Sequence, residues 1–203
     1  MNVRLMYNFD FLAGIYYQDQ LQINRYTAHV TLLTQTEDTS SSNVAMDRVK
    51  NFVHGELFST VFFGPQDHDK AEMFHVMGVN VTTLPEEPVD QIIGMMLYFK
   101  LNAIMEDRMT ITSLDISSTL GDSVWYSLDG DDNMAPFENA SESAWWYSSS
   151  TQHHDLDNES VPDNVVRVMP SDWHEYGLQW PEECAEPTNN TVIYPNFQRN
   201  ETK

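Results

Sequence analysis

The order of periodic segments along residues 1–126 constrains the fold of this chain more than any other feature. Two segments rich in β-branched and aromatic residues come first and predict strands. Two segments with apolar residues at helical spacing follow, and a third strand-like segment comes after them. Two antiparallel hairpins with both helices on one face satisfy this order, so we expect an α+β fold with an antiparallel four-stranded sheet. The expected elements are strands at residues 3–17 and 25–35, helices at 44–63 and 88–105, a strand at 109–117 and a short strand from 125.

Local signals place the boundaries of these elements. Gly64-Pro65 stops the first helical pattern. Pro88 suits the first turn of the second helix, because a backbone N–H has no partner there anyway. The bend between the first two strands is expected at residues 19–24, and the polar stretch 36–43 is expected to be a loop.

The chain is strongly acidic. Its 203 residues hold 10 Lys and Arg against 31 Asp and Glu, which gives a formal net charge of −21. Such a charge repels phosphate groups, so we expect no direct binding to nucleic acid and none to an anionic membrane. No stretch approaches the roughly 20 apolar residues of a membrane span, and the chain starts without an apolar signal core. The single cysteine, Cys184, can form neither an internal disulfide nor a cysteine-ligated zinc site, so we expect a cytoplasmic protein.

Negative charge and tryptophan concentrate in the C-terminal part. Residues 1–120 carry 7 basic and 15 acidic side chains, a net of −8, whereas residues 121–203 carry 3 and 16, a net of −13. All five tryptophans lie beyond residue 120, and disordered tails are poor in aromatic residues. We therefore predict a domain at residues 1–126 and an irregular acidic extension at 127–203, held by aromatic anchors on that domain or on a neighbouring subunit. A short helix is expected at residues 171–179.

Five short strings follow one another in the first part of the chain. They are FDFLAGIYY at 9–17, NRYTAHVTL at 24–32, VAMDRVKNFV at 44–53, Asp67-His68, and EEPVDQIIGMML at 86–97. In their order and spacing they resemble the 6-pyruvoyl- and 6-carboxy-tetrahydropterin synthase family of tunnelling-fold enzymes, over about residues 4–126. The resemblance implies the tunnelling fold and a ring-shaped homo-oligomer whose sheets form a barrel. It also implies a pterin or purine ligand between subunits.

The family holds zinc with three histidines, and this chain lacks them. Carried over position by position, they become Ile15, Asn24 and Tyr26. Isoleucine has no lone pair to donate, an asparagine amide is a poor zinc ligand, and a tyrosine phenol with a pKa of about 10 is costly to ionise. We therefore expect a degenerate family member with no metal, no cofactor and no zinc-dependent lyase activity.

Three side chains are candidates for chemistry without a metal. Asp67 and His68 fall where the family has an Asp-His pair, and a histidine oriented by a carboxylate can shuttle protons near neutral pH. In the string QDHDK the pair reads equally well as solvated surface. Asp115 lies in the string MTITSLDIS, where the resemblance implies a carboxylate that binds the amidine-like edge of the pterin through two parallel hydrogen bonds. The strand parity also allows Ser113 or Ser118 at that place, or an outward-facing Asp115 without a ligand.

Three hypotheses for the function follow. The first is a zinc-less homologue of the pterin synthases that acts as a binding or scaffold protein and keeps a pterin or purine pocket between subunits. The second is a metal-free enzyme that uses Asp67, His68 or Asp115, although the balance of residues is against an enzyme. The third is an acidic interaction protein, a viral one for instance. Its charge would mimic nucleic acid, or its extension would bind a protein partner in an assembly.

Overall fold

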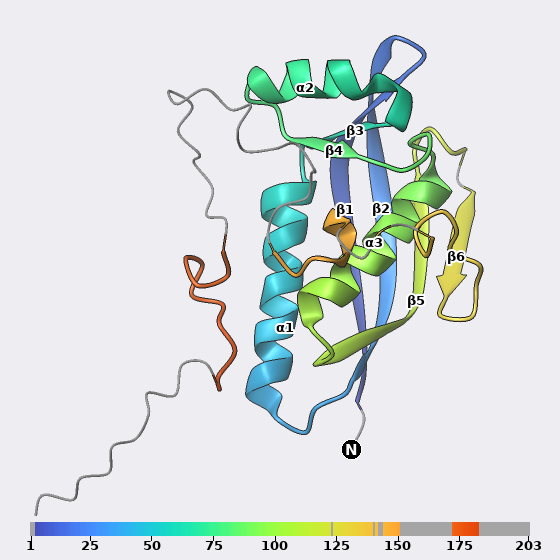
Figure 1. Cartoon of the computed structure of the whole chain (residues 1–203). Helices are drawn as coiled ribbons and strands as arrows, with labels where there is room; N and C mark the ends of the chain where they lie inside the picture. The colour runs from blue at the N-terminus through green and yellow to red at the C-terminus, as the bar shows by residue number, and fades with distance from the viewer. Residues whose placement is uncertain (1–2, 123, 140, 142–143, 151–171, 183–203) are drawn as a thin grey trace, which may run out of the picture.

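The computed structural model describes residues 3–122, 124–139, 141, 144–150 and 172–182. Its first two strands, β1 (Arg4–Tyr17) and β2 (Gln20–Thr34), form one long antiparallel hairpin (Figure 1). Gln18 and Asp19 make the two-residue turn with φ values of 49° and 59°, the left-handed pair that a tight hairpin needs. The bend predicted at residues 19–24 is therefore wrong in its extent, because residues 20–24 pair with β1 in unbroken register.

In the part of the chain that the structure describes, the sheet has six strands in the order β4-β3-β1-β2-β5-β6. β5 (Met109–Ser118) and β6 (Trp125–Asp129) continue the antiparallel part beside β2. β3 (Val61–Phe63) and β4 (Val81–Thr83) add a short parallel part beside β1. The fold is α+β, as predicted, but the prediction of a four-stranded, wholly antiparallel sheet is wrong. Strands of three residues give too little alternation to be recognised in a sequence.

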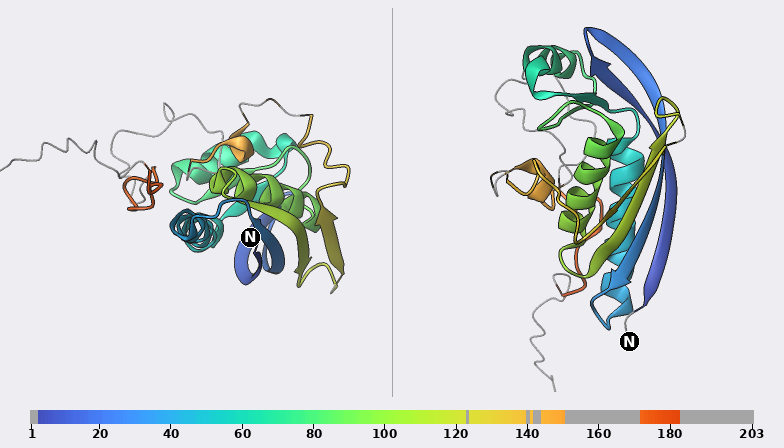
Figure 2. Two further views of the ribbon diagram at one scale, coloured as in Figure 1. Left: turned by 90° about the horizontal axis from the view of Figure 1, so that it is seen from below. Right: turned by 90° about the vertical axis from the view of Figure 1, so that its right-hand side faces the viewer.

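Two helices lie on one face of the antiparallel strands (Figure 2). α1 (Thr39–Asn51) passes into a π-helical turn, Phe52–Leu57, and α3 (Asp90–Met105) packs beside α1. We call this side of the sheet the helix face and the opposite side the open face. None of the described helices combines the length and the hydrophobicity that spanning a bilayer requires.

Two helices begin where the sequence predicts loop. The Asp38 carboxylate accepts hydrogen bonds from the N–H groups of Ser40 and Ser41, and this cap starts α1 at residue 39, inside the stretch expected to be loop. The string QDHDK opens a short helix, α2 (His68–Val76), which the apolar pattern does not reveal because Ala71 is its one buried residue.

Helix α2 covers a different side of the sheet from α1 and α3. Successive residues of a strand point to opposite faces, and in β3 the Phe62 side chain joins the main core. Val61 and Phe63 point the other way into a second apolar cluster, which α2 closes with Ala71 and Phe74. This cluster lies at the end of the molecule that holds the turn of the β1–β2 hairpin (Figure 1).

Helix α3 is buried on all sides around residues 93–97. Gln91 at its start is exposed, and Tyr98 and Asn102 are half-buried. Towards the sheet, Gly94 lets the helix approach so closely that a Cβ there would lie 2.8 Å from Cγ2 of Ile116. On the other side the short turn Trp145–Tyr147, labelled η3, lies against α3 as a third layer (Figure 2). A helix that is apolar all round needs such cover on every side, so the sheet and the extension share its burial.

Four tryptophans of the extension belong to the main core. Trp145, Trp146, Trp173 and Trp180 are 1–6% exposed. Trp125 differs, because it lies on β6 and is 47% exposed. Burial of a tryptophan on this scale removes roughly 150–250 Å² from water, at about 25 cal/mol per Å², so these side chains hold residues 144–150 and 172–182 on the main core.

The structure bears on two other predictions about this region, the helix at 171–179 and the boundary between 126 and 127. The described residues of the segment expected as a helix at 171–179 form turns, so that prediction is wrong over residues 172–179. The Asp172 carboxylate accepts a hydrogen bond from the His174 N–H, but no helix follows among the described residues. β6 runs on to Asp129 and so crosses the predicted boundary between 126 and 127. The division into a domain and an extension stays a prediction.

Lys100 connects α3 to the outer layer. Its side chain is fully buried, and Nζ donates hydrogen bonds to the carbonyl oxygens of Trp145, Ser148 and Ser150 at 3.2, 2.8 and 3.0 Å. An ammonium group has three N–H donors, so these three carbonyls match its full capacity. The Lys100 amine therefore fixes the path of the chain from residue 145 to 150.

Arg48 on α1 holds residues 172–182 in a comparable way. It is 2% exposed, and its Nε donates to the Leu178 carbonyl oxygen at 2.7 Å. Nη1 bonds Glu106 Oε1 at 2.9 Å, and the guanidinium carbon lies 3.8 Å from the centroid of the Trp180 ring. The Trp180 indole N–H in turn donates to Glu106 Oε2 at 2.7 Å. A cation, a carboxylate and an indole thus satisfy one another where the extension meets α1.

Candidate functional site

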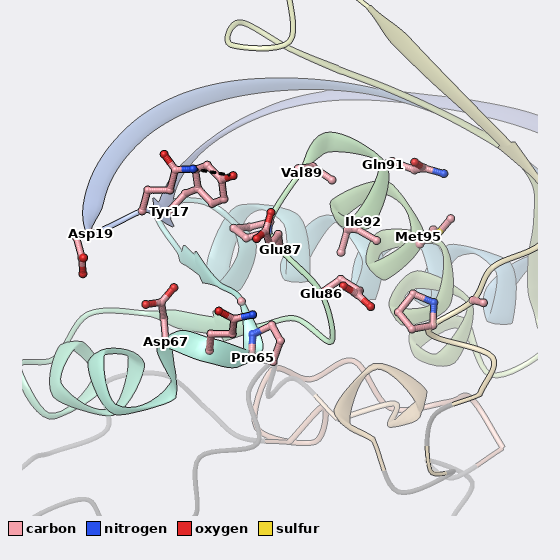
Figure 3. Close-up of a pocket in the computed structure, with 16 residues that line it drawn as sticks. Tyr17, Asp19, Pro65, Asp67, Glu86, Glu87, Val89, Gln91, Ile92 and Met95 are labelled. Carbon is pink, nitrogen blue, oxygen red and sulfur yellow. Dashed lines mark hydrogen bonds between the residues drawn. The ribbon is translucent and has the colours of Figure 1, made fainter.

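A cleft of about 700 Å³ opens where three parts of the chain meet (Figure 3). The tip of the β1–β2 hairpin, the turn Pro65–Asp67 before α2 and the segment that leads into α3 line it, together with Ala135 and Pro136. We call this the hairpin cleft. Its carboxylates are those of Asp19, Asp67, Glu86 and Glu87.

Proline and glycine shape the cleft. Gly64 and Pro65 end β3 and start the single helical turn of Pro65–Asp67, which puts Asp67 on the cleft wall. A Cβ on Gly64 would lie 3.5 Å from Cα of Glu87, an ordinary contact distance, so the two walls lie close together here. Pro88 is buried just before α3, and Val89 forms the extended N-cap of that helix. The backbone that forms the cleft is therefore set by residues with restricted conformations.

One lysine partly neutralises the acidic walls. Lys70 Nζ forms an ion pair with Asp19 and lies 3.8 Å from Asp67 Oδ1. The hydrogen bond from Lys70 lowers the pKa of Asp19, and the same bond raises the pKa of Lys70. Both groups are therefore charged at neutral pH, with the lysine amine fixed between the hairpin turn and α2.

Asp67 and His68 do not form the relay that the family resemblance implies. Asp67 lines the cleft, whereas His68 is exposed at the first residue of α2 and does not line it. The hydrogen bonds of the described residues include none between these two side chains. A proton relay would need such a contact, so a catalytic role for the pair stays a proposal without support from this geometry.

Ile15, Asn24 and Tyr26 all point to the helix face. In the hairpin register Ile15 pairs with Gln22, and Asn24 and Tyr26 follow at two-residue steps on the same side. Ile15 and Asn24 are diagonal neighbours, a relation that places side chains within about 7–8 Å. The three positions thus share one face of the hairpin, with Tyr26 one further two-residue step away from Ile15.

The side chains at these positions act as core. Ile15 packs against the main core. Asn24 accepts the Leu120 N–H through Oδ1 at 3.1 Å. The Tyr26 ring stacks on Phe11 with centroids 4.8 Å apart, and its hydroxyl lies buried beside the Asn24 amide without a hydrogen bond of good geometry. Burial raises the pKa of Tyr26, the Asn24 amide lowers it less, and the charge of Asp90 adds to the rise. A phenol that resists ionisation in this way does not fit a zinc site.

Asp115 points to the open face. In the register it lies opposite His29 of β2 and Ser127 of β6, and its Oδ1 accepts the Ser127 hydroxyl at 2.5 Å. The His29 ring stacks on Trp125 with centroids 4.7 Å apart. Asp115 is therefore separated by the sheet from Ile15, Asn24 and Tyr26, and the structure does not bring these candidates together within one chain. Among the residues that the structure describes, no group of three or more His, Cys, Asp and Glu side chains is placed to hold a metal ion.

The sequence analysis does not identify Lys100 and Arg48, the two cationic side chains that are buried among the described residues. Burial lowers the pKa of Lys100 to about 7, and the charge of Glu56 opposes the shift. The signal in the sequence is that Lys100 is the one charged residue between 91 and 105 of an apolar helical pattern, where a lysine has to find buried acceptors. For Arg48 no comparable signal exists, because its partners lie about 60 and 130 residues further along the chain.

Comparisons with known proteins give a fold-level likeness. No family model matches the chain. No curated protein matches it either. Among solved structures, an uncharacterized protein of Wolinella succinogenes is similar at 12% identity with a TM-score of 0.47, over 64% of this chain and 99% of that one. The 6-pyruvoyl tetrahydropterin synthase of Plasmodium vivax is similar at 9% identity with a TM-score of 0.41, over 63% of this chain and 97% of the synthase. At these identities the likeness concerns the fold alone.

Proposed function

We propose that this chain is a zinc-less relative of the tetrahydropterin synthases that acts as a binding or scaffold protein. The observation that carries the proposal is the fate of the three ligand positions. Ile15, Asn24 and Tyr26 share the helix face, and they serve there as an apolar contact, an amide that accepts a backbone N–H and a stacked ring. Such a replacement would remove the zinc-dependent chemistry and keep the fold.

The metal content of the natural chain tests this proposal first. Protein prepared without chelator should hold zinc well below one ion per chain in elemental analysis, because no set of residues at these positions can ligate it. One tightly bound zinc ion per chain would overturn the proposal.

A designed variant tests whether Ile15, Asn24 and Tyr26 correspond to the zinc ligands of the family. The triple variant Ile15→His, Asn24→His, Tyr26→His should gain a zinc site, seen as a zinc-dependent rise in Tm of refolded protein. A matched control, Ile15→His, Ile23→His, Arg25→His, has the same three histidines, but the register places two of them on the open face. It should show no such rise. A folded triple variant whose Tm does not change with zinc would show that these positions do not correspond to the family's ligands.

We further propose that the chain forms a closed homo-oligomer through its sheet edges. β1 pairs with β3 only at Gly14 and Ile15, so residues 4–13 meet no other strand on that side within the described part of the chain. β6 forms the opposite edge of the sheet. Proteins usually pair or cover long free edges, and pairing of these two edges between copies would do so.

Light scattering across a salt series tests the assembly. Each copy carries a formal charge of −21, so the oligomer should tighten as salt rises and screens the repulsion between copies. Dissociation on lowering the salt is the expected result. A monomer at every ionic strength would contradict the proposed assembly.

We further propose that a pterin or purine is the ligand and that it binds at Asp115. Its support is an exposed Trp125 ring next to a carboxylate on the open face, since a planar heterocycle can stack on the ring while its amidine edge bonds the carboxylate. A thermal-shift titration with a pterin should raise the Tm of the natural chain and not that of Asp115→Asn. Equal shifts in both proteins, or none, would exclude Asp115 as the ligand-binding residue.

A further inference from the structure

The hairpin cleft has an apolar floor. Its accessible carbon surface comes from Pro65, Pro136 and Ile92, whereas Pro88 and Met95 at this place are buried. Figure 3 shows Ile92 on the α3 side of the cleft, with Pro65 on the facing wall. A floor of this kind offers flat, rigid contact to an aliphatic stem or a planar group, and it loses no side-chain entropy at the prolines.

The rim of the cleft carries excess negative charge. Four carboxylates line it, and Lys70 interacts with two of them, Asp19 and Asp67. Glu86 and Glu87 are exposed on the segment before α3, and neither forms an ion pair among the described residues. The carboxylates therefore outnumber the amine, and the two glutamates remain available to an incoming cation.

We propose that the hairpin cleft binds a basic segment of a partner protein through its arginine or lysine side chains. The aliphatic stems would lie on Ile92, Pro65 and Pro136, and the charged heads would meet Glu86 and Glu87. Arginine and lysine combine an apolar stem with a cationic head, which is the chemistry that an apolar floor with an acidic rim complements.

Size and overall charge favour the same occupant. A volume of about 700 Å³ holds several side chains of an extended segment. A chain with a net charge of −21 attracts basic proteins over long distances and repels nucleic acids. The proposal does not depend on pterin binding or on ring assembly, since every residue that it uses lies in one chain.

Fluorescence anisotropy with the full chain tests the proposal. The probe is a short labelled peptide of alternating arginine and glycine, at about 150 mM salt where long-range attraction is screened. The double variant Glu86→Gln, Glu87→Gln should bind it at least about tenfold more weakly than the natural chain. The control Glu37→Gln, Glu72→Gln removes the same charge from exposed positions outside the cleft, and its affinity should change by less than about twofold.

Three results would overturn the proposal. Equal weakening in both double variants would show that the net charge, and not the cleft, attracts the peptide. Absence of saturable binding to the natural chain would exclude the site. Saturable binding of spermine with none of the peptide would assign the cleft to a small polyamine. Circular dichroism of each variant shows that the substitutions, all on exposed side chains, leave the fold intact.

Discussion

Helix α3 is covered on two sides, and the buried Lys100 joins the outer cover to it. The sheet covers one side at the close approach of Gly94, and the turn around Trp145 covers the other. Without the outer layer, α3 would present an apolar surface and a desolvated amine to water. Three backbone carbonyls satisfy that amine, and leaving them unpaired would cost roughly 1–3 kcal/mol for each group. The residues after β6 therefore complete the core of this chain.

The buried layer bears on function as well. On the helix face, Tyr26 and Ile15, two of the positions that the family resemblance assigns to zinc, pack into the main core. What remains accessible is the open face around Asp115 and the hairpin cleft around Glu86 and Glu87. Both combine carboxylates with carbon surface, which suits binding.

The sequence predicts those parts of the fold that have a strong local period. The hairpin of β1 and β2, the helix α3 and the strand β5 follow from alternating or helical apolar spacing. β3, β4 and α2 do not, because they are short and depend on contacts with Tyr16 and one another. For the candidate site, Asp67 is found by resemblance, but the cleft is not, since Glu86 and Asp19 come together only through tertiary structure. The resemblance assigns roles to positions in the sequence, but it does not show to which face of the sheet each side chain points.

Equilibrium urea unfolding followed with two probes shows whether the outer layer and the rest of the core unfold as one cooperative unit. Tryptophan fluorescence reports mainly on the four buried indoles of Trp145, Trp146, Trp173 and Trp180, and far-UV circular dichroism reports on the sheet and helices. We expect coincident transitions, and we expect Lys100→Met to lower both midpoints together while Lys50→Met, at an exposed position, leaves them in place. A fluorescence transition at lower urea, with the circular dichroism unchanged there, would contradict this expectation, because the extension would then unfold as a separate unit.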